Sequence, residues 1–149
     1  VTADTPARLV EKLARGKCLA VAKDHPSAVV LGCDTVVDVG GEVFGKPHSV
    51  EDAKRMLRAL SGATHEVHTG VCVSDGLRTE SFVDSCKVTF FPIPEEEIDA
   101  YTATKEPYDK AGAYAIQGRA ALWLDRLEGD YYTIMGLPVS RTARLLGRF

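Results

Sequence analysis

The spacing of apolar residues predicts helices at four places in this 149-residue chain. Apolar side chains recur every three or four residues between charged ones over 6–24, which predicts an amphipathic helix, interrupted near Gly16. The same period over 50–60 follows a serine that has an aspartate three residues later, a pattern typical of a capped helix start. Further helices are predicted over 95–104, where three glutamates follow a proline, and over 139–146.

Strands are predicted where apolar residues form short uncharged runs or alternate with polar ones. The run 28–32 is aliphatic, 65–73 alternates, and 78–91 returns after an Asp-Gly turn, while 120–127 gives a last strand. Helices and hairpins of this kind predict the α/β class, with a mixed sheet flanked by helices.

A Gly40-Gly41 pair predicts a tight hairpin directly after a β-branched strand that begins at Asp34. Such a hairpin would bring Asp34 close to Lys46 in the Gly-Lys-Pro sequence that follows. A carboxylate can bind Mg²⁺ or take a proton from water, and a lysine can neutralise phosphate charge, so the pair suits a metal-bound phosphate substrate. The alternative is a surface hairpin in which Asp34 caps a strand end and Lys46 is solvated.

Composition narrows the class of partner. The chain is 45% hydrophobic, has the size of one domain, and carries 18 basic and 21 acidic residues for a net charge of −3. This balance argues against a broad nucleic-acid or membrane surface, so a polyphosphate would be bound by a local cluster. The chain shows neither an apolar run of about 18 residues nor a signal-peptide pattern, so we expect a cytoplasmic protein. The four cysteines form no CxxC pair and suggest buried, reduced thiols.

Other chemistry-bearing residues lie in the second half of the chain. Asp109 and Lys110 share a loop with small residues that would let a ligand approach the backbone, with Asp109 as a metal ligand and Lys110 on phosphate. The alternative is an ordinary Asp–Lys surface pair. His65 and His68 lie three apart in an alternating strand and would face opposite sides, which argues against a shared metal ion. The tyrosine pair at 131–132 and Trp123 are expected in the core or an interface.

Several ordered segments together resemble the Maf family of nucleoside triphosphate pyrophosphatases, which cleave between the α and β phosphates. The segments are GCDTVV, GKP, EDAKRMLRALSGATHEVHTG and EPYDKAGAYAIQG, and the similarity runs over about 13–146. The resemblance implies an elongated α/β sheet with a cleft between two lobes. It also implies a Mg²⁺ or Mn²⁺ cofactor and a nucleoside triphosphate as the partner, with a homodimer left open.

The resemblance implies roles for individual residues. Asp34 matches the proposed proton acceptor, and whether it serves as base or as metal ligand stays open. Lys17 and Lys46 match lysines placed on phosphate. Thr35 and Gln117 match the branch that acts on thymidine and uridine triphosphates, and a glutamine amide can pair with the edge of a pyrimidine.

One part of the family pattern has no match. The family begins with an apolar strand and an S-x-S-P-R-R loop, so we expect 1–149 to be a single domain truncated at its N-terminus. A nucleotide-binding regulator of septum formation with little turnover is therefore one alternative function. A pyrophosphatase for purines such as inosine triphosphate is another, although Thr35 and Gln117 argue against it.

Overall fold

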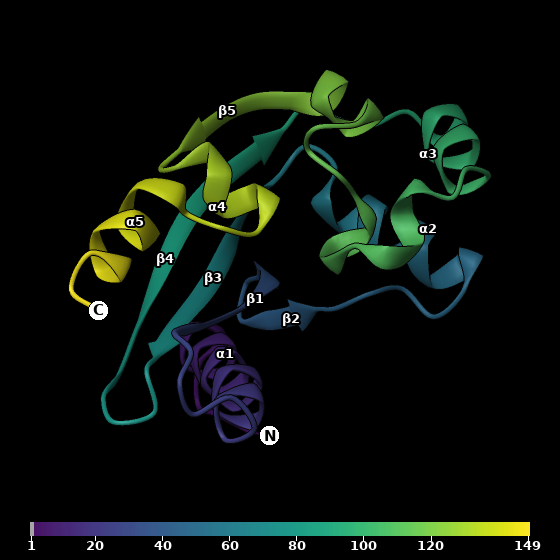
Figure 1. Ribbon diagram of the computed structural model, residues 1–149. Helices are drawn as coiled ribbons and strands as arrows, with labels where there is room; N and C mark the ends of the chain where they lie inside the picture. The colour runs from purple at the N-terminus through teal and green to yellow at the C-terminus, as the bar shows by residue number, and fades with distance from the viewer. Residues whose placement is uncertain (1) are drawn as a thin grey trace. The chain divides into compact units, whose positions relative to one another are not determined.

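A single five-stranded sheet organises the chain in the computed structural model, which describes residues 2–149 (Figure 1). The strands are β1 (Val30–Val39), β2 (Glu42–Phe44), β3 (Thr64–Ser74), β4 (Thr79–Phe90) and β5 (Leu124–Glu128). Their order across the sheet is β2-β1-β3-β4-β5, and the outer pairs, β1 with β2 and β4 with β5, are antiparallel. Helices pack against this sheet, which confirms the predicted α/β class.

The predicted helices are all present. They are α1 (Pro6–Ala22), α2 (Val50–Leu60), α3 (Glu95–Thr102) and α5 (Val139–Leu146). The side chain of Ser49 accepts a hydrogen bond from the Asp52 N–H, so the capped start of α2 is confirmed. The interruption predicted near Gly16 is wrong, because α1 continues through it. A Cβ at Gly16 would meet no atom within 4 Å, so this glycine lies in open space and does not break the helix.

Strand β1 corrects the prediction for the first part of the sheet. It is one continuous strand of ten residues, so Asp34 lies in its middle and does not cap a strand end. The Gly40-Gly41 hairpin is confirmed, since both glycines have positive φ angles of 60° and 95° and Val39 pairs with Glu42. Glycine is required at 32 by the helix that packs over it.

Two glycines bring α1 onto the sheet. A Cβ at Gly32 of β1 would lie 2.8 Å from the backbone nitrogen of Cys18, and a Cβ at Gly70 of β3 would lie 2.6 Å from the carbonyl oxygen of Val10. Real Cβ atoms do not approach other atoms so closely, so no larger residue fits without displacing the helix. The small helix residue Ala14 is fully buried at the same contact. This close packing fixes the position of the α1 backbone relative to β1 and β3.

Two other segments differ from the prediction. The first half of the strand predicted over 120–127 is a 3₁₀ turn, Arg119–Trp123, and only β5 continues as a strand. The turn buries Trp123, whose carbonyl accepts a hydrogen bond from the N–H of Phe91. The short helix α4 (Tyr131–Met135) was not predicted. It begins with an Asp130 side-chain cap and ends at Gly136, which has a φ of +118°.

The chain forms two compact units. The first comprises residues 1–35, 68–85 and 130–149, and the second comprises 36–67 and 86–129. In the first unit, α1 packs on β1 and β3 through the glycine contacts above. In the second, an aromatic cluster forms the core, with neighbouring ring centroids 4.9 to 6.1 Å apart: His65, Phe90, Tyr101, Tyr114 and Trp123.

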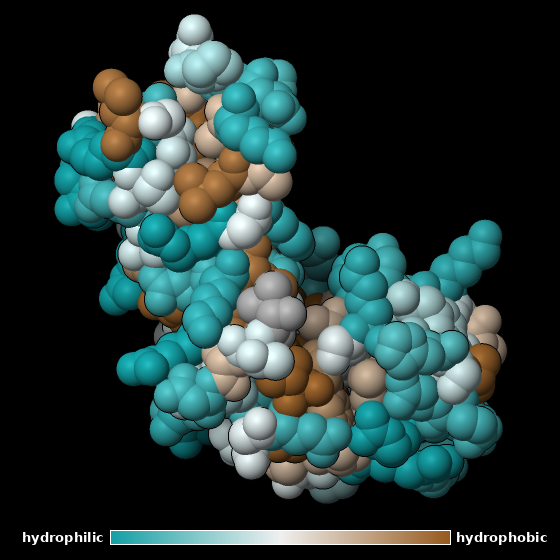
Figure 2. All heavy atoms as spheres, turned by 90° about the horizontal axis from the view of Figure 1, so that it is seen from below, coloured by the Kyte–Doolittle hydropathy of each residue, from teal (hydrophilic) through white to brown (hydrophobic). Residues whose placement is uncertain are grey.

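Polar residues cover most of the surface face seen in Figure 2, with apolar side chains scattered among them. Tyr131 and Tyr132 are 37% and 51% exposed, so they do not belong to the core, and their place in an interface stays a prediction. Trp123 is buried, as predicted. The cysteines are all free thiols, and only Cys33 is partly exposed. None of the helices in the described part of the chain is long and apolar enough to span a membrane.

His65 makes the stability of the fold depend on pH. Its ring is 2% exposed, Nε2 lies 2.6 Å from the Tyr114 hydroxyl, and burial lowers its pKa from 6.5 to about 4. Between pH 6.5 and 4 the unfolded chain therefore binds a proton that the folded chain does not. We expect the free energy of unfolding to fall by up to about 3 kcal/mol over this range because of His65.

The measurement is urea unfolding at pH 7 and pH 4.5. A His65→Gln variant should lose this part of the pH dependence, whatever its stability at pH 7. His25→Gln is the matched control, because His25 lies exposed in the loop after α1. An equal fall in stability for parent and His65→Gln would contradict the prediction.

Candidate active site

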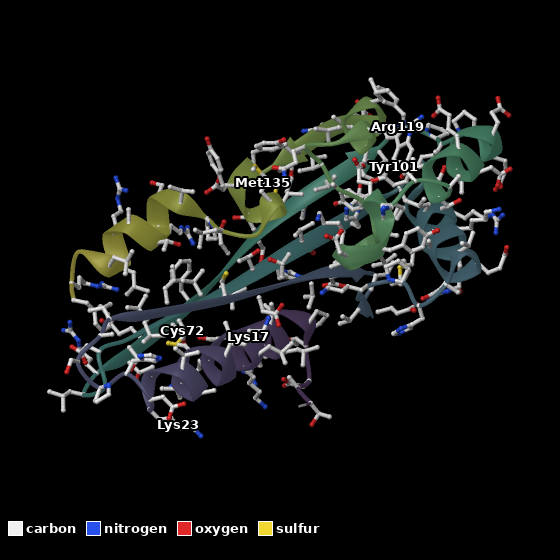
Figure 3. All side chains as sticks on the ribbon, turned by 45° about the vertical axis from the view of Figure 1, so that its right-hand side comes forward. Lys17, Lys23, Cys72, Tyr101, Arg119 and Met135 are labelled. Carbon is white, nitrogen blue, oxygen red and sulfur yellow. The ribbon has the colours of Figure 1, made fainter. Side chains whose placement is uncertain are left out.

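Asp34 and Lys17 form an ion pair between β1 and α1. The Lys17 Nζ lies 3.4 Å from Asp34 Oδ2, and the Thr35 N–H donates to Asp34 Oδ1 at 2.9 Å. The Asp34 side chain is 23% exposed and that of Lys17 is 59% exposed, so a ligand can reach both. Figure 3 shows Lys17 on α1, whose position over β1 follows from the glycine contacts. Lys17, which the family resemblance placed on phosphate, thus lies beside Asp34.

Cys33 precedes Asp34 in β1 and is partly exposed. Burial raises the pKa of its thiol, an effect larger than the lowering caused by the Lys17 ammonium. The thiol therefore stays protonated near neutral pH and is a poor nucleophile. This agrees with the absence of any predicted chemistry for the cysteines.

Thr35 faces away from Asp34, because neighbouring residues of a strand point to opposite sides of the sheet. Its hydroxyl oxygen lies 2.8 Å from that of Thr69 on β3, and a Cβ at Gly136 would lie 3.6 Å from it. Thr35 contributes its backbone N–H to Asp34 and presents its hydroxyl on the other face of β1.

Lys46, Asp109 and Lys110 gather in the second unit. The loop after β2 is joined to the later loop by a hydrogen bond of 3.1 Å from the Gly112 N–H to the Gly45 carbonyl. Lys110 Nζ lies 3.0 Å from Asp109 Oδ1, and this hydrogen bond, helped by the charges of Lys110 and Lys46, lowers the pKa of the Asp109 carboxyl. The Asp–Lys pair weighed as the alternative at this loop is thus present, and it leaves Asp109 73% exposed and available to a ligand.

Gln117 is exposed on a loop whose backbone contacts the side chains of Tyr101 and Glu106. The Tyr101 hydroxyl donates to the Glu106 carboxylate and accepts from the Ala115 N–H at 3.1 Å. The Glu106 carboxylate lies so close to Gly118 that any side chain there would overlap it. Sequence reasoning missed this support, because nothing in the spacing of Tyr101 and Glu106 relates them to residues 115–118.

The predicted site residues thus fall into two groups. Lys17, Asp34 and Thr35 lie in the first unit, and Lys46, Asp109, Lys110 and Gln117 lie in the second. The proximity of Asp34 and Lys46 stays a prediction. Among residues 2–149 no three acidic, histidine or cysteine side chains gather into a ready metal site.

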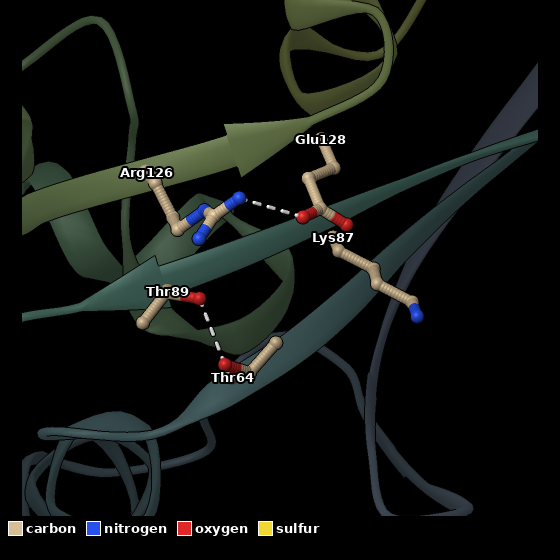
Figure 4. A pocket seen from close by; sticks show the side chains of 5 residues that line it. All are labelled: Thr64, Lys87, Thr89, Arg126 and Glu128. Atoms are coloured by element: carbon tan, nitrogen blue, oxygen red, sulfur yellow. Dashed lines mark hydrogen bonds and ion pairs between the residues drawn. The ribbon is translucent and has the colours of Figure 1, made fainter.

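A polar hollow of about 160 Å³ opens on the sheet in the second unit and contains none of the predicted residues (Figure 4). Four of its lining residues form two pairs. The hydroxyl oxygens of Thr64 and Thr89 lie 2.7 Å apart, and Arg126 forms an ion pair of 2.9 Å with Glu128. Lys87 completes the lining. The hollow therefore contains two basic residues and one acidic residue.

Comparison with known proteins adds independent information. The profile of the family described as "Maf-like protein" matches residues 2–149. A dTTP/UTP pyrophosphatase of Bacillus cytotoxicus is 48% identical over 145 residues, which cover 97% of this chain and 76% of that protein. Proteins with the same name from Bacillus mycoides and Bacillus velezensis are 47% and 48% identical, again over 97% of this chain and over 76% and 77% of their own lengths.

Proposed function

This chain belongs to the family of Maf-like proteins, and from that premise we propose that it is a nucleoside triphosphate pyrophosphatase acting on dTTP and UTP. The observation that carries the proposal is the match of nearly the whole chain to dTTP/UTP pyrophosphatases at 45% to 48% identity. The partly exposed Asp34–Lys17 pair supports it, because a carboxylate and an ammonium are suited to a metal-bound triphosphate. The products would be the nucleoside monophosphate and pyrophosphate.

The reaction requires an activated water. Its oxygen attacks the α-phosphorus, the bond from that phosphorus to the bridging oxygen of the β-phosphate breaks, and pyrophosphate leaves with the electron pair. Asp34 has one carboxylate oxygen engaged by the Thr35 N–H and the other loosely paired with Lys17, so each keeps lone pairs free. These lone pairs suit it to accept the proton of the water or to bind a cation. Lys17 adds positive charge where the phosphates gather negative charge.

A divalent cation such as Mg²⁺ or Mn²⁺ fits the oxygen donors present. Mg²⁺ is commonly held by one or two carboxylates together with substrate phosphates, without a dedicated protein cage. The lack of a three-ligand cluster among residues 2–149 agrees with that mode. Asp34 in the first unit and Asp109 in the second are each proposed as a carboxylate ligand for such an ion, and when bound it would offset the charge on the phosphates.

The residues of the second unit have proposed roles of their own. Lys46 and Lys110 are assigned to phosphate oxygens as exposed point charges. Gln117 is assigned to the base, because its amide carries both a donor and an acceptor on a loop that Tyr101 and Glu106 hold in place.

The experiment is a panel of nucleoside triphosphates assayed for pyrophosphate release with Mg²⁺ and with Mn²⁺. We expect dTTP and UTP to be used at least tenfold more efficiently, in kcat/KM, than GTP, ATP or CTP. Mass spectrometry of the nucleotide product separates cleavage after the α-phosphate from stepwise phosphate loss. Release of inorganic phosphate, or equal use of all the nucleotides, would refute the proposal.

A further inference from the structure

A pocket of about 240 Å³ lies between β4 and α5 in the first unit. Leucine and phenylalanine supply its apolar surface and three arginines its positive charge: Phe82 of β4, and Arg141, Arg144, Leu145 and Arg148 of α5. Leu145 is buried and Phe82 is partly buried, whereas the three arginines are exposed. We call it the α5 pocket, and it joins apolar surface to positive charge at one place.

The α5 pocket and the Asp34–Lys17 pair lie on opposite faces of the sheet. Ser81 of β4 is bonded to α1, since its hydroxyl donates to Glu11 Oε2 at 2.6 Å. Neighbouring residues of a strand point to opposite sides, so Phe82 faces away from α1. Because Lys17 belongs to α1, the α5 pocket is separate from the proposed active site.

Two ion pairs join β4 to α5 around this pocket. Glu80, Phe82 and Asp84 are alternate residues of β4 and share one face of the strand. Arg141 Nη1 lies 2.9 Å from Asp84 Oδ1, and Arg148 Nη2 lies 3.2 Å from Glu80 Oε1. Each pair is neutral as a whole. The strand therefore presents Phe82 between the two carboxylates, at the position where a third one would stand.

Arg144 follows one paired arginine of α5 and precedes the other, and it keeps a free hydrogen-bonding edge. Its Nη1 donates to the carbonyl and the hydroxyl of Ser140, at 3.0 and 2.9 Å. No carboxylate among residues 2–149 forms an ion pair with it. The Nε–H and one N–H of Nη2 point the same way and form the fork that fits a carboxylate. Arg58 binds Glu95 through these same two atoms, at 2.8 and 3.1 Å.

We propose that the α5 pocket binds a small monocarboxylate with an aromatic or branched apolar body. The carboxylate pairs with Arg144, and the body contacts Phe82 and Leu145. A cavity of about 150 Å³ is enough for benzene, so 240 Å³ has room for a ring and a carboxylate. Polyphosphates fit poorly, because the carboxylates of Asp84 and Glu80 would repel further negative charge. The inference therefore goes beyond the proposed function.

The test is an NMR titration of the full chain with sodium phenylacetate in the absence of nucleotide. We expect a dissociation constant on the order of 1 mM, with shifts in the amide signals of residues 80–84 and 140–148. Phenylacetamide has the ring without the charge, and acetate has the charge without the ring. Each should bind at least about tenfold more weakly than phenylacetate.

Arg144→Gln should weaken phenylacetate binding at least about tenfold, the effect of one charged hydrogen-bonded pair. Arg144→Lys keeps the charge without the fork, so it should also bind more weakly than the parent. Arg8→Gln is the matched control, because Arg8 is an exposed arginine of α1 that pairs with Asp4. It should keep the parental constant. Circular-dichroism melts show whether each variant is folded.

Phenyl phosphate tests the preference for a single charge, because it is a dianion at about pH 8. We expect it to bind more weakly than phenylacetate, and we expect Glu80→Gln to narrow the difference severalfold. Tighter binding of phenyl phosphate by the parent would overturn the inference in favour of a phosphate site. An unchanged constant in folded Arg144→Gln, or no saturable shift in the parent, would overturn it as well. These measurements involve no hydrolysis, so their outcome is independent of whether the chain releases pyrophosphate from dTTP.

Discussion

Replacing Asp34 with asparagine should lower turnover at least about a hundredfold while the protein remains folded. The amide has nearly the shape of the carboxylate, so the hydrogen bond from the Thr35 N–H can persist. It carries no charge, however, and it is neither a useful base nor a strong ligand for a divalent cation. Both roles considered for Asp34 therefore predict the same large loss, which is measured as pyrophosphate release per enzyme molecule.

The matched control is Asp125→Asn on β5, which makes the same chemical change at an exposed aspartate in the other unit. It should leave turnover within about twofold of the parent, as expected for an exposed residue with no assigned role. Thermal melts of both variants show whether the fold is kept. Parental turnover in folded Asp34→Asn would remove Asp34 from the mechanism and leave Lys17 paired with a residue of structural value only.

Sequence reasoning succeeded where local chemistry decides the conformation. The Gly40-Gly41 hairpin follows from two positive φ angles that glycine adopts readily, and the start of α2 follows from the Ser49 cap. These features depend on residues a few positions apart, so they can be predicted from the sequence.

Contacts between site residues and residues far away in the sequence could not be predicted in this way. Lys17 meets Asp34 only because Gly32 and Gly70 let α1 approach the sheet, and the hydroxyl of Thr35 is set by Thr69. Nothing in the spacing of residues 17 and 34, or 35 and 69, distinguishes a contact from a chance pair. Long-range packing decides such contacts, and it also turned the first half of the predicted strand over 120–127 into a turn that buries Trp123.

Gly70→Ala should destabilise the protein by on the order of 3 kcal/mol, because the new methyl group would lie 2.6 Å from the Val10 carbonyl oxygen. The atom in its way belongs to the helix backbone, so a side-chain rotation cannot relieve the overlap and α1 must move away from β3. For a chain of this length that loss lowers the melting temperature by about 10 °C. The displacement of α1 should also carry Lys17 away from Asp34 and lower turnover in the protein that remains folded.

Gly16→Ala is the matched control, since it adds the same methyl group to the same helix at a position with no atom within 4 Å. Alanine in a helix interior is more stable than glycine by about 0.5–1 kcal/mol, so the melting temperature should rise where Gly70→Ala lowers it. Opposite shifts from one chemical change would show that the approach of α1 to the sheet, rather than helix propensity, limits stability here. A Gly70→Ala protein that melts with the parent would mean that α1 can shift at little cost, and the Lys17–Asp34 pair would then lose its explanation in the packing of the helix.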